Sequence, residues 1–176
     1  HIRITNFDSN NSFEEVAIDR KQDFVEEIKK IPAVKNIHVY ATKAGIIKTR
    51  DEIQGIVVKG IDTDFDKIFL KDKIKQGHFP VLNDSVKSNE ILISSKLASL
   101  LKLKLNEAIV IYFIQETPRV RKFNIAGIYE TGLEEFDNLY LFCDIKNILK
   151  LNGWSSEKVG GFEVTVKNFS NLETVS

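Results

Sequence analysis

The chain has 176 residues and 43% of them are hydrophobic, which is enough for one large domain or two small ones with a buried core. Basic and acidic residues balance at 25 each, so the chain has no overall field that would attract nucleic acid or anionic lipid. One cysteine excludes an internal disulfide, and three histidines leave little for a metal site. The longest apolar run, residues 108–114, is far too short to span a membrane.

The sequence contains no methionine. We therefore expect a processed chain or a piece of a longer protein, with His1 as the remnant of a tag. Any membrane anchoring is then expected in the flanking sequence.

The first third of the chain predicts a strand, a helix and a long extended segment. Residues 1–7 alternate as a short strand. Asp19 and Gln22 resemble a capping arrangement for a helix that ends at Pro32. The apolar face of this helix carries Phe24, Val25, Ile28 and Ile31.

The next segment is extended and then turn-rich. Residues 34–58 have a strand-like pattern, with a turn predicted at residues 43–45. Residues 60–66 contain many turn formers and mark a domain boundary. One or two helical turns follow at residues 69–74, and residues 81–89 have the polar composition of a loop.

The middle of the chain predicts a strand and helix followed by a hairpin. Residues 90–93 form a short strand, and Ser94 or Ser95 caps the helix after it. Residues 108–115 are apolar on both faces, which is typical of a central strand. They pair with residues 121–129 in an antiparallel hairpin.

The last third repeats the strand–helix–strand order. Residues 140–143 form a strand, and a helix then ends at Asn152 and Gly153. Residues 162–166 alternate as the last strand, and Ser170 caps a short terminal helix.

This order of elements predicts an α+β fold rather than alternating α/β. Each end of the chain contributes a strand–helix–strand unit, so we expect the two ends to pack together at one pole. We expect two lobes: residues 1–60 and 139–176 form one, and residues 61–138 form an inserted, β-rich one.

No sequence motif supports an enzyme. Phosphate-binding loops, nucleophile elbows and zinc-ligand spacings are all absent. We expect no catalytic residue, no cofactor and no metal. Cys143 is predicted to be a buried small hydrophobe, His38 to lie on the solvent face of a strand, and His78 to lie in a turn without a partner at chelating spacing.

Two further features, an acidic segment and a tryptophan, are candidate sites. The carboxylates of residues 130–137 are expected to form a solvated loop rather than a catalytic pair. Trp154 either anchors a partner or covers the end of its own helix.

Several phrases in order along the chain resemble one family. They are Val58-Lys59-Gly60-Ile61-Asp62, Ile74-Lys75-Gln76-Gly77-His78-Phe79-Pro80, Glu90-Ile91-Leu92-Ile93-Ser94-Ser95-Lys96-Leu97-Ala98 and Phe123-Asn124-Ile125-Ala126-Gly127-Ile128-Tyr129. Together they resemble the extracytoplasmic (periplasmic core) domain of lipoprotein-releasing and MacB-like ABC transporter permeases, in the FtsX-like permease superfamily. The sequence departs at Leu105-Asn106-Glu107, where the family usually has Gly-Asp.

The resemblance implies a non-catalytic periplasmic domain of a cytoplasmic (inner) membrane protein. It implies a membrane-proximal, porter-like lobe from both chain ends and an inserted, sabre-like lobe, with Gly60 and Gly77 supplying turns. The implied partners are a second permease subunit, a cytoplasmic ATPase that acts through membrane helices, and a lipoprotein or periplasmic protein, with no nucleic acid.

The resemblance leaves the substrate open. Some lipoprotein-releasing members carry a long hairpin that hooks a carrier protein, where this sequence has only residues 115–120. We take Pro118, Arg119 and Trp154 as candidate contacts for a partner. The chain is therefore a subunit without the hook, or it serves another substrate or regulates a cell-wall enzyme. A stand-alone binding or scaffold module is the alternative.

Overall fold

Nine strands join into one mixed sheet in the computed structural model, which describes residues 1–7 and 13–167. The order in the sheet is β1 (Ile2–Thr5), β11 (Gly161–Val166), β3 (Val34–Lys48), β4 (Ile53–Ile61), β9 (Tyr140–Asp144), β6 (Glu90–Ser94), β8 (Arg119–Tyr129) and β5 (Ile74–Gly77), while β7 (Ala108–Phe113) pairs with β3 and β8. A small second sheet pairs β2 (Ile18–Asp19) with β10 (Lys158–Val159). The helices are α1 (Asp23–Lys29), α2 (Ile68–Lys71), α3 (Ser95–Leu100), α4 (Glu134–Asp137) and α5 (Ile145–Asn152).

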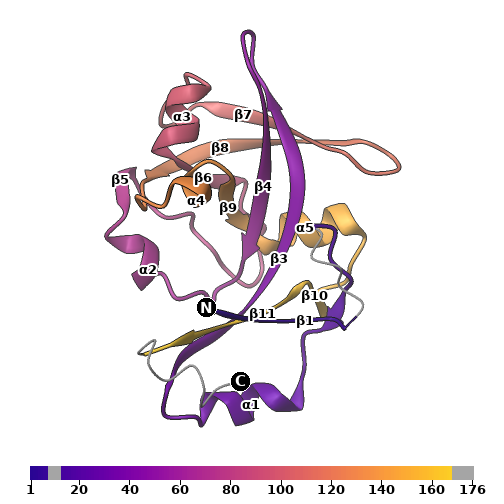
Figure 1. Ribbon diagram of the computed structural model, residues 1–176. Coiled ribbons are helices and arrows are strands. Elements are labelled where there is room, and N and C mark those ends of the chain that lie inside the picture. The colour runs from indigo at the N-terminus through magenta and orange to yellow at the C-terminus, as the bar shows by residue number, and fades with distance from the viewer. Residues whose placement is uncertain (8–12, 168–176) are drawn as a thin grey trace.

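The long antiparallel ribbon of β3 and β4 runs through the molecule, and the β7–β8 hairpin crosses it (Figure 1). The predicted turn at residues 43–45 is wrong, because β3 continues to Lys48 and the chain turns at residues 49–52. Gly45 instead marks the crossing. A Cβ at this position would lie 2.8 Å from Cγ2 of Ile111, so the glycine allows β7 to approach.

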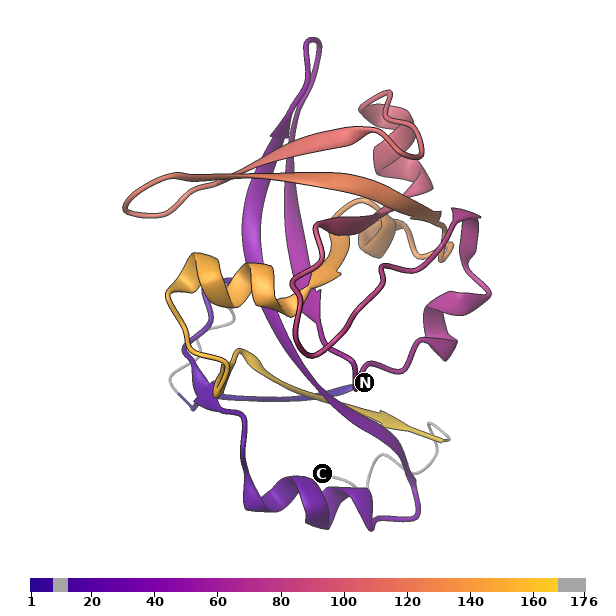
Figure 2. The same ribbon diagram turned by 180° about the vertical axis from the view of Figure 1, so that it is seen from behind.

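The described chain ends lie side by side, as predicted. Strand β1 pairs with β11, and β11 pairs in turn with β3. Helix α1 lies beside these strands (Figure 2) and packs on one of their faces. The rings of Phe24 and Phe162 meet there edge to face, with centroids 5.3 Å apart. The first and last described strands are therefore neighbours in the sheet, as far as Val166. The helix predicted at Ser170 lies outside the described residues.

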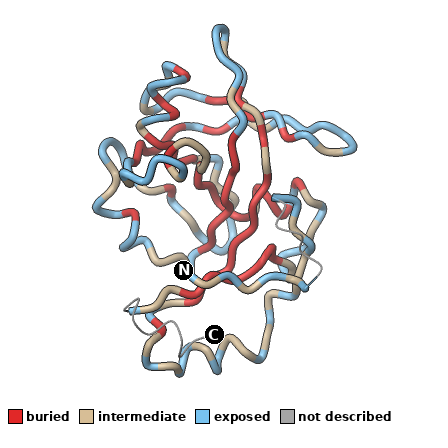
Figure 3. Tube along the Cα trace, viewed as in Figure 1, coloured by how far each residue is buried: buried red, intermediate tan, exposed pale blue. Residues whose placement is uncertain are grey.

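Burial is greatest along the middle of β3 and the second half of β4 and falls toward the tips of both hairpins (Figure 3). The larger hydrophobic core includes Ile37 near the chain ends and Ile125 in the middle block. Parallel pairing of β9 with β4 and antiparallel pairing with β6 carry the sheet across the proposed boundaries at residues 60 and 138. The fold is α+β as predicted, and the division into two lobes stays a prediction.

Caps and turns account for several element ends. The Ser94 hydroxyl accepts a hydrogen bond from the Leu97 amide and so caps α3, as predicted. Helix α5 ends at Gly153, whose φ of 66° is the left-handed conformation that glycine adopts easily. The cap predicted at Asp19 is wrong, because this residue lies in β2 and Gln22 occupies the N-cap of α1.

Two further predictions, for residues 108–115 and for Gly60, differ from the structure. Strand β7 is buried on one face only, and Tyr112 on its other face is 44% exposed. Gly60 lies within β4 rather than in a turn, and a Cβ there would lie 2.7 Å from Cα of Ile145 in α5. Asn106 has a φ of 67°, so it holds a backbone conformation that asparagine tolerates better than most residues.

Candidate functional site

Four charged or titratable side chains form a row on the face of the sheet opposite α1. Arg3 lies directly across from Glu163, and Glu163 lies across from His38, so their side chains point to the same face. Lys59 joins this face from β4. The apolar neighbours of these residues point the other way, toward α1. Strand alternation thus creates an ionic face and an apolar face from the same segments.

Glu163 is the centre of the row. Its Oε1 accepts from Nε of Arg3 at 3.0 Å and from Nζ of Lys59 at 2.5 Å, while Oε2 lies 3.2 Å from Nε2 of His38. Because an ionised carboxylate can only accept, Nε2 of His38 carries the proton in this contact. Nζ of Lys59 also lies 5.2 Å from the ring centroid of Tyr40.

Three members of the row are buried, while the Arg3 side chain is 49% exposed, and the pKa values of the row reflect this burial. Glu163 is 3% exposed and Lys59 is 5% exposed. Burial alone would raise the pKa of Glu163, but the hydrogen bond from His38 and the charges of Lys59 and Arg3 outweigh it and lower this pKa to about 2. Burial also lowers the pKa of Lys59, against the opposing charge of Glu163.

The prediction that His38 faces solvent is wrong, since it is only 2% exposed. Its position in the alternation is as expected, but the segment after β4 covers that face, and the ring of Phe65 meets His38 edge to face at 4.9 Å. The sequence held a signal for this row. Arg3, His38 and Glu163 each stand between apolar residues in a strand, and their charges are complementary.

A cavity of about 460 Å³ lies over the row. Its charged wall contains Arg3, His38, Lys59 and Glu163, and its apolar wall comes from residues 65–69, residues 133–136 and Phe142 of β9. Phe142 is paired with Lys59 across β4 and β9, so the row and the aromatic wall meet within one sheet. This cavity therefore has buried charged groups on one wall and apolar side chains on the other, which makes it the candidate site.

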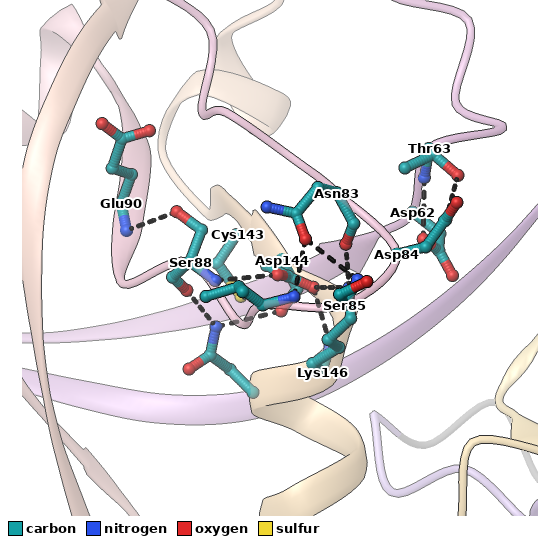
Figure 4. A network of polar contacts seen from close by, with 12 residues as sticks. Asp62, Thr63, Asn83, Asp84, Ser85, Ser88, Glu90, Cys143, Asp144 and Lys146 are labelled. Carbon is teal, nitrogen blue, oxygen red and sulfur yellow. Dashed lines mark hydrogen bonds and ion pairs between the residues drawn. The ribbon is translucent and has the colours of Figure 1, made fainter.

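A polar network fastens the 81–89 loop to the junction of β9 and α5 (Figure 4). Asp144 accepts from the amides of Ser88 and Lys146, and Asn147 donates to the Ser88 carbonyl oxygen. Nζ of Lys146 donates to the carbonyl oxygen of Asn83 at 2.6 Å. The carboxylate that caps α5 therefore also holds the loop, which gives it a structural role.

Two of the three predicted partner contacts come together. Arg119 and Trp154 line an open pocket of about 430 Å³ between the end of α5 and the β7–β8 connection. Pro118 is exposed at the tip of that connection, which comprises residues 114–118. The short hairpin predicted there is confirmed. Trp154 also packs partly against the main core, in agreement with the reading that it covers the end of its own helix, and its contact with a partner stays a prediction.

The remaining candidate residues have structural surroundings. Cys143 is fully buried, as predicted, and this burial raises the pKa of its thiol. His78 is exposed in a turn, as predicted. The carboxylate of Asp137 is the exception in its acidic segment. It is 5% exposed and accepts from the Thr131 and Gly132 amides, so it orders the loop.

Residues 1–7 and 13–167 offer neither a metal cluster nor a membrane-spanning helix. No cluster of three or more His, Cys, Asp or Glu side chains there has an arrangement that could hold a metal ion. None of the helices in the same part of the chain is both long enough and apolar enough to cross a bilayer.

The fold is similar to those of two solved transporter domains. No protein-family model matches the sequence, and no curated protein matches it. The extracellular domain of the noncanonic ABC-type transporter YknZ from Gram-positive bacteria has a TM-score of 0.59 and 15% identity, over 90% of this chain and 78% of that chain. The periplasmic region of MacB from Actinobacillus actinomycetemcomitans has a TM-score of 0.56 and 14% identity, over 89% of this chain and 70% of that chain. The predicted resemblance to MacB-like extracytoplasmic domains is confirmed as a likeness of fold.

Proposed function

We propose that this chain is a non-catalytic extracytoplasmic domain of an ABC transporter permease of the MacB and YknZ type. The fold shared with the YknZ and MacB domains over about nine-tenths of the chain carries this proposal. The chain would stand outside the cytoplasmic membrane and couple a partner on that side to ATP hydrolysis on the other. The pairing of β1 with β11 supports it, because two membrane helices could continue from neighbouring strands.

Within this class we propose the lipoprotein-releasing type, with a second permease subunit and a lipoprotein or another periplasmic protein as partners. The open pocket of Arg119 and Trp154 would contribute to a partner contact, with Pro118 at its edge. The connection of residues 114–118 is much smaller than the roughly 20–30 residues per side of a standard interface. It would therefore act together with other surfaces.

The location of the domain can be tested with a single introduced cysteine in the full-length protein. Cys143 is 0% exposed, so the native chain gives little background. Gly55 is exposed and a side chain there would meet open space. In a full-length protein whose cysteines outside this chain are replaced by serine, we expect the Gly55→Cys variant in intact cells to react with a membrane-impermeant maleimide, while the same protein with Gly55 does not. Labelling that requires lysis of the cells would contradict the extracytoplasmic assignment.

The partner contact can be followed by fluorescence, because Trp154 is the only tryptophan. We expect its emission to shift when the extracytoplasmic domain of the second permease subunit is added. The double variant Pro118→Gly, Arg119→Ser should weaken that binding about three- to tenfold without abolishing it, since the tip is small. Ile53→Ser, at an exposed position on β4, is the matched control. Complete loss of tight binding in the double variant would show that the tip forms the interface alone.

A further inference from the structure

We propose that the cavity over the charged row binds a small amphipathic anion, a molecule with an apolar body and one carboxylate-like head. The cavity volume of about 460 Å³ falls within the range of sites that take small organic molecules. The proposal depends on the two walls of this cavity and not on the transporter assignment.

The apolar wall would receive the body of the ligand. Phe65 and Phe142 face the cavity with ring centroids 6.3 Å apart, and Phe136 lies 5.9 Å from Phe142. Ile68 and Leu133 also line it but are 62% and 59% exposed. Apolar side chains that stay exposed around an apolar hollow are typical of a binding groove. A bound hydrocarbon or aromatic body would cover them.

The opposite wall has an excess of positive charge. Arg3 and Lys59 share the single carboxylate of Glu163. Glu15, the other carboxylate near these cations, does not line the cavity and is bonded to the amide and hydroxyl of Thr42. The Arg3 side chain is 49% exposed, so an anionic head can reach its guanidinium group.

The rim adds no charge that would oppose an anion. Lys35 and Asp66, which also line the cavity, pair with each other at 3.0 Å. The charges of these two groups therefore cancel. The two cations and one carboxylate of the charged wall then favour a negatively charged ligand.

His38 supplies a second, independent indication of a ligand. Its ring lines the cavity and is almost fully buried, and its Nδ1 has no hydrogen-bond partner within residues 1–7 and 13–167. A buried polar atom without a partner costs free energy. In the tautomer that carries its proton on Nε2, toward Glu163, Nδ1 is an acceptor. A small movement of the ring toward the cavity would let a water that enters with the ligand donate to this atom.

The test uses decanoate as the probe and isothermal titration calorimetry of the purified chain, below the micelle concentration. We expect one site per chain for decanoate. Decyltrimethylammonium, with the same chain and the opposite charge, should bind at least tenfold more weakly, and decanol should also bind more weakly. No heat of binding at millimolar decanoate, or equal binding of the cationic analogue, would overturn the proposal.

Matched variants locate the site. Leu133 is exposed at the mouth, so substitutions there leave the core intact. Leu133→Asp should weaken decanoate binding at least fivefold, while Leu133→Lys should not weaken it. Ile114→Asp places the same charge at a 65% exposed position on the β7–β8 hairpin and should have no effect. Equal weakening by Leu133→Asp and Ile114→Asp would place binding outside this cavity and overturn the proposal. Urea unfolding checks that each variant is folded.

Discussion

Replacing Glu163 with glutamine is expected to lower the free energy of unfolding by about 3–5 kcal/mol. The carboxylate accepts from Arg3, Lys59 and His38, and Lys59 is only 5% exposed. Without the negative charge, Lys59 stays buried beside Arg3 with no counter-charge in the row. Urea denaturation of both proteins at pH 7 measures the difference.

The pH dependence gives a second measure of the same interaction. The folded-state pKa of Glu163 is about 2, below its ordinary value of 4.5, so its ionised form stabilises the fold. This contribution, on the order of 3 kcal/mol, is complete above pH 4.5 and is lost as the pH falls toward 2. The Glu163→Gln variant should therefore lose less stability than the parent chain between pH 4.5 and 2.

Two controls separate the charge of the row from side-chain packing. Glu134 pairs with Lys96 at 2.7 Å on the surface, and Glu134→Gln should leave stability unchanged because water screens that pair. Adding Lys59→Met to Glu163→Gln should recover part of the lost stability, since it removes the unpaired cation. If Glu163→Gln proves as mild as Glu134→Gln, the row contributes no net stabilisation.

Replacing Gly77 with alanine should destabilise the chain by about 2–4 kcal/mol, because two penalties combine there. Gly77 has a φ of 71°, which disfavours a side chain, and a Cβ would collide with the carbonyl oxygen of Ala126 on the neighbouring strand β8. The midpoint of urea unfolding measures the loss. The family resemblance predicted a required glycine at this position, and the structure gives the cause.

Two other glycines serve as controls that isolate each penalty. Gly132 has a φ of 80° but open space around its Cβ position, so Gly132→Ala should cost only about 1 kcal/mol. Gly55 has open space and no positive φ, and Gly55→Ala should stay within about 0.5 kcal/mol of the parent. A Gly77→Ala variant no less stable than Gly132→Ala would show that β5 shifts freely away from Ala126.

Local patterns in the sequence predict most helices and strands correctly. The wrong predictions lie where a contact with a distant segment determines the conformation. The phrase from Glu90 to Leu97 reads as a strand, a cap and a helix because each signal is local, and the structure agrees. The sequence predicts turns at Gly45 and Gly60, but each glycine instead permits another element to approach a continuous strand. A glycine in a strand pattern does not reveal which of these roles it has.

The same limit applies to the candidate site. Alternation correctly placed His38 on the face opposite Ile37 and Val39. What covers that face is the 65–69 segment, and no periodicity in the sequence indicates where that segment folds. Trp154 and Arg119 are 35 residues apart in the sequence, and only the hairpin geometry brings them to one pocket.

Strand β3 joins two distant parts of the molecule. Its 15 residues, at about 3.3 Å each, make a continuous strand about 50 Å long. Val34 at its first end pairs with Val166 near the described chain ends, and Ile46 near its other end pairs with Tyr112 of the crossing hairpin. One continuous backbone segment therefore connects the paired chain ends with the β7–β8 hairpin, with no loop between the two contacts.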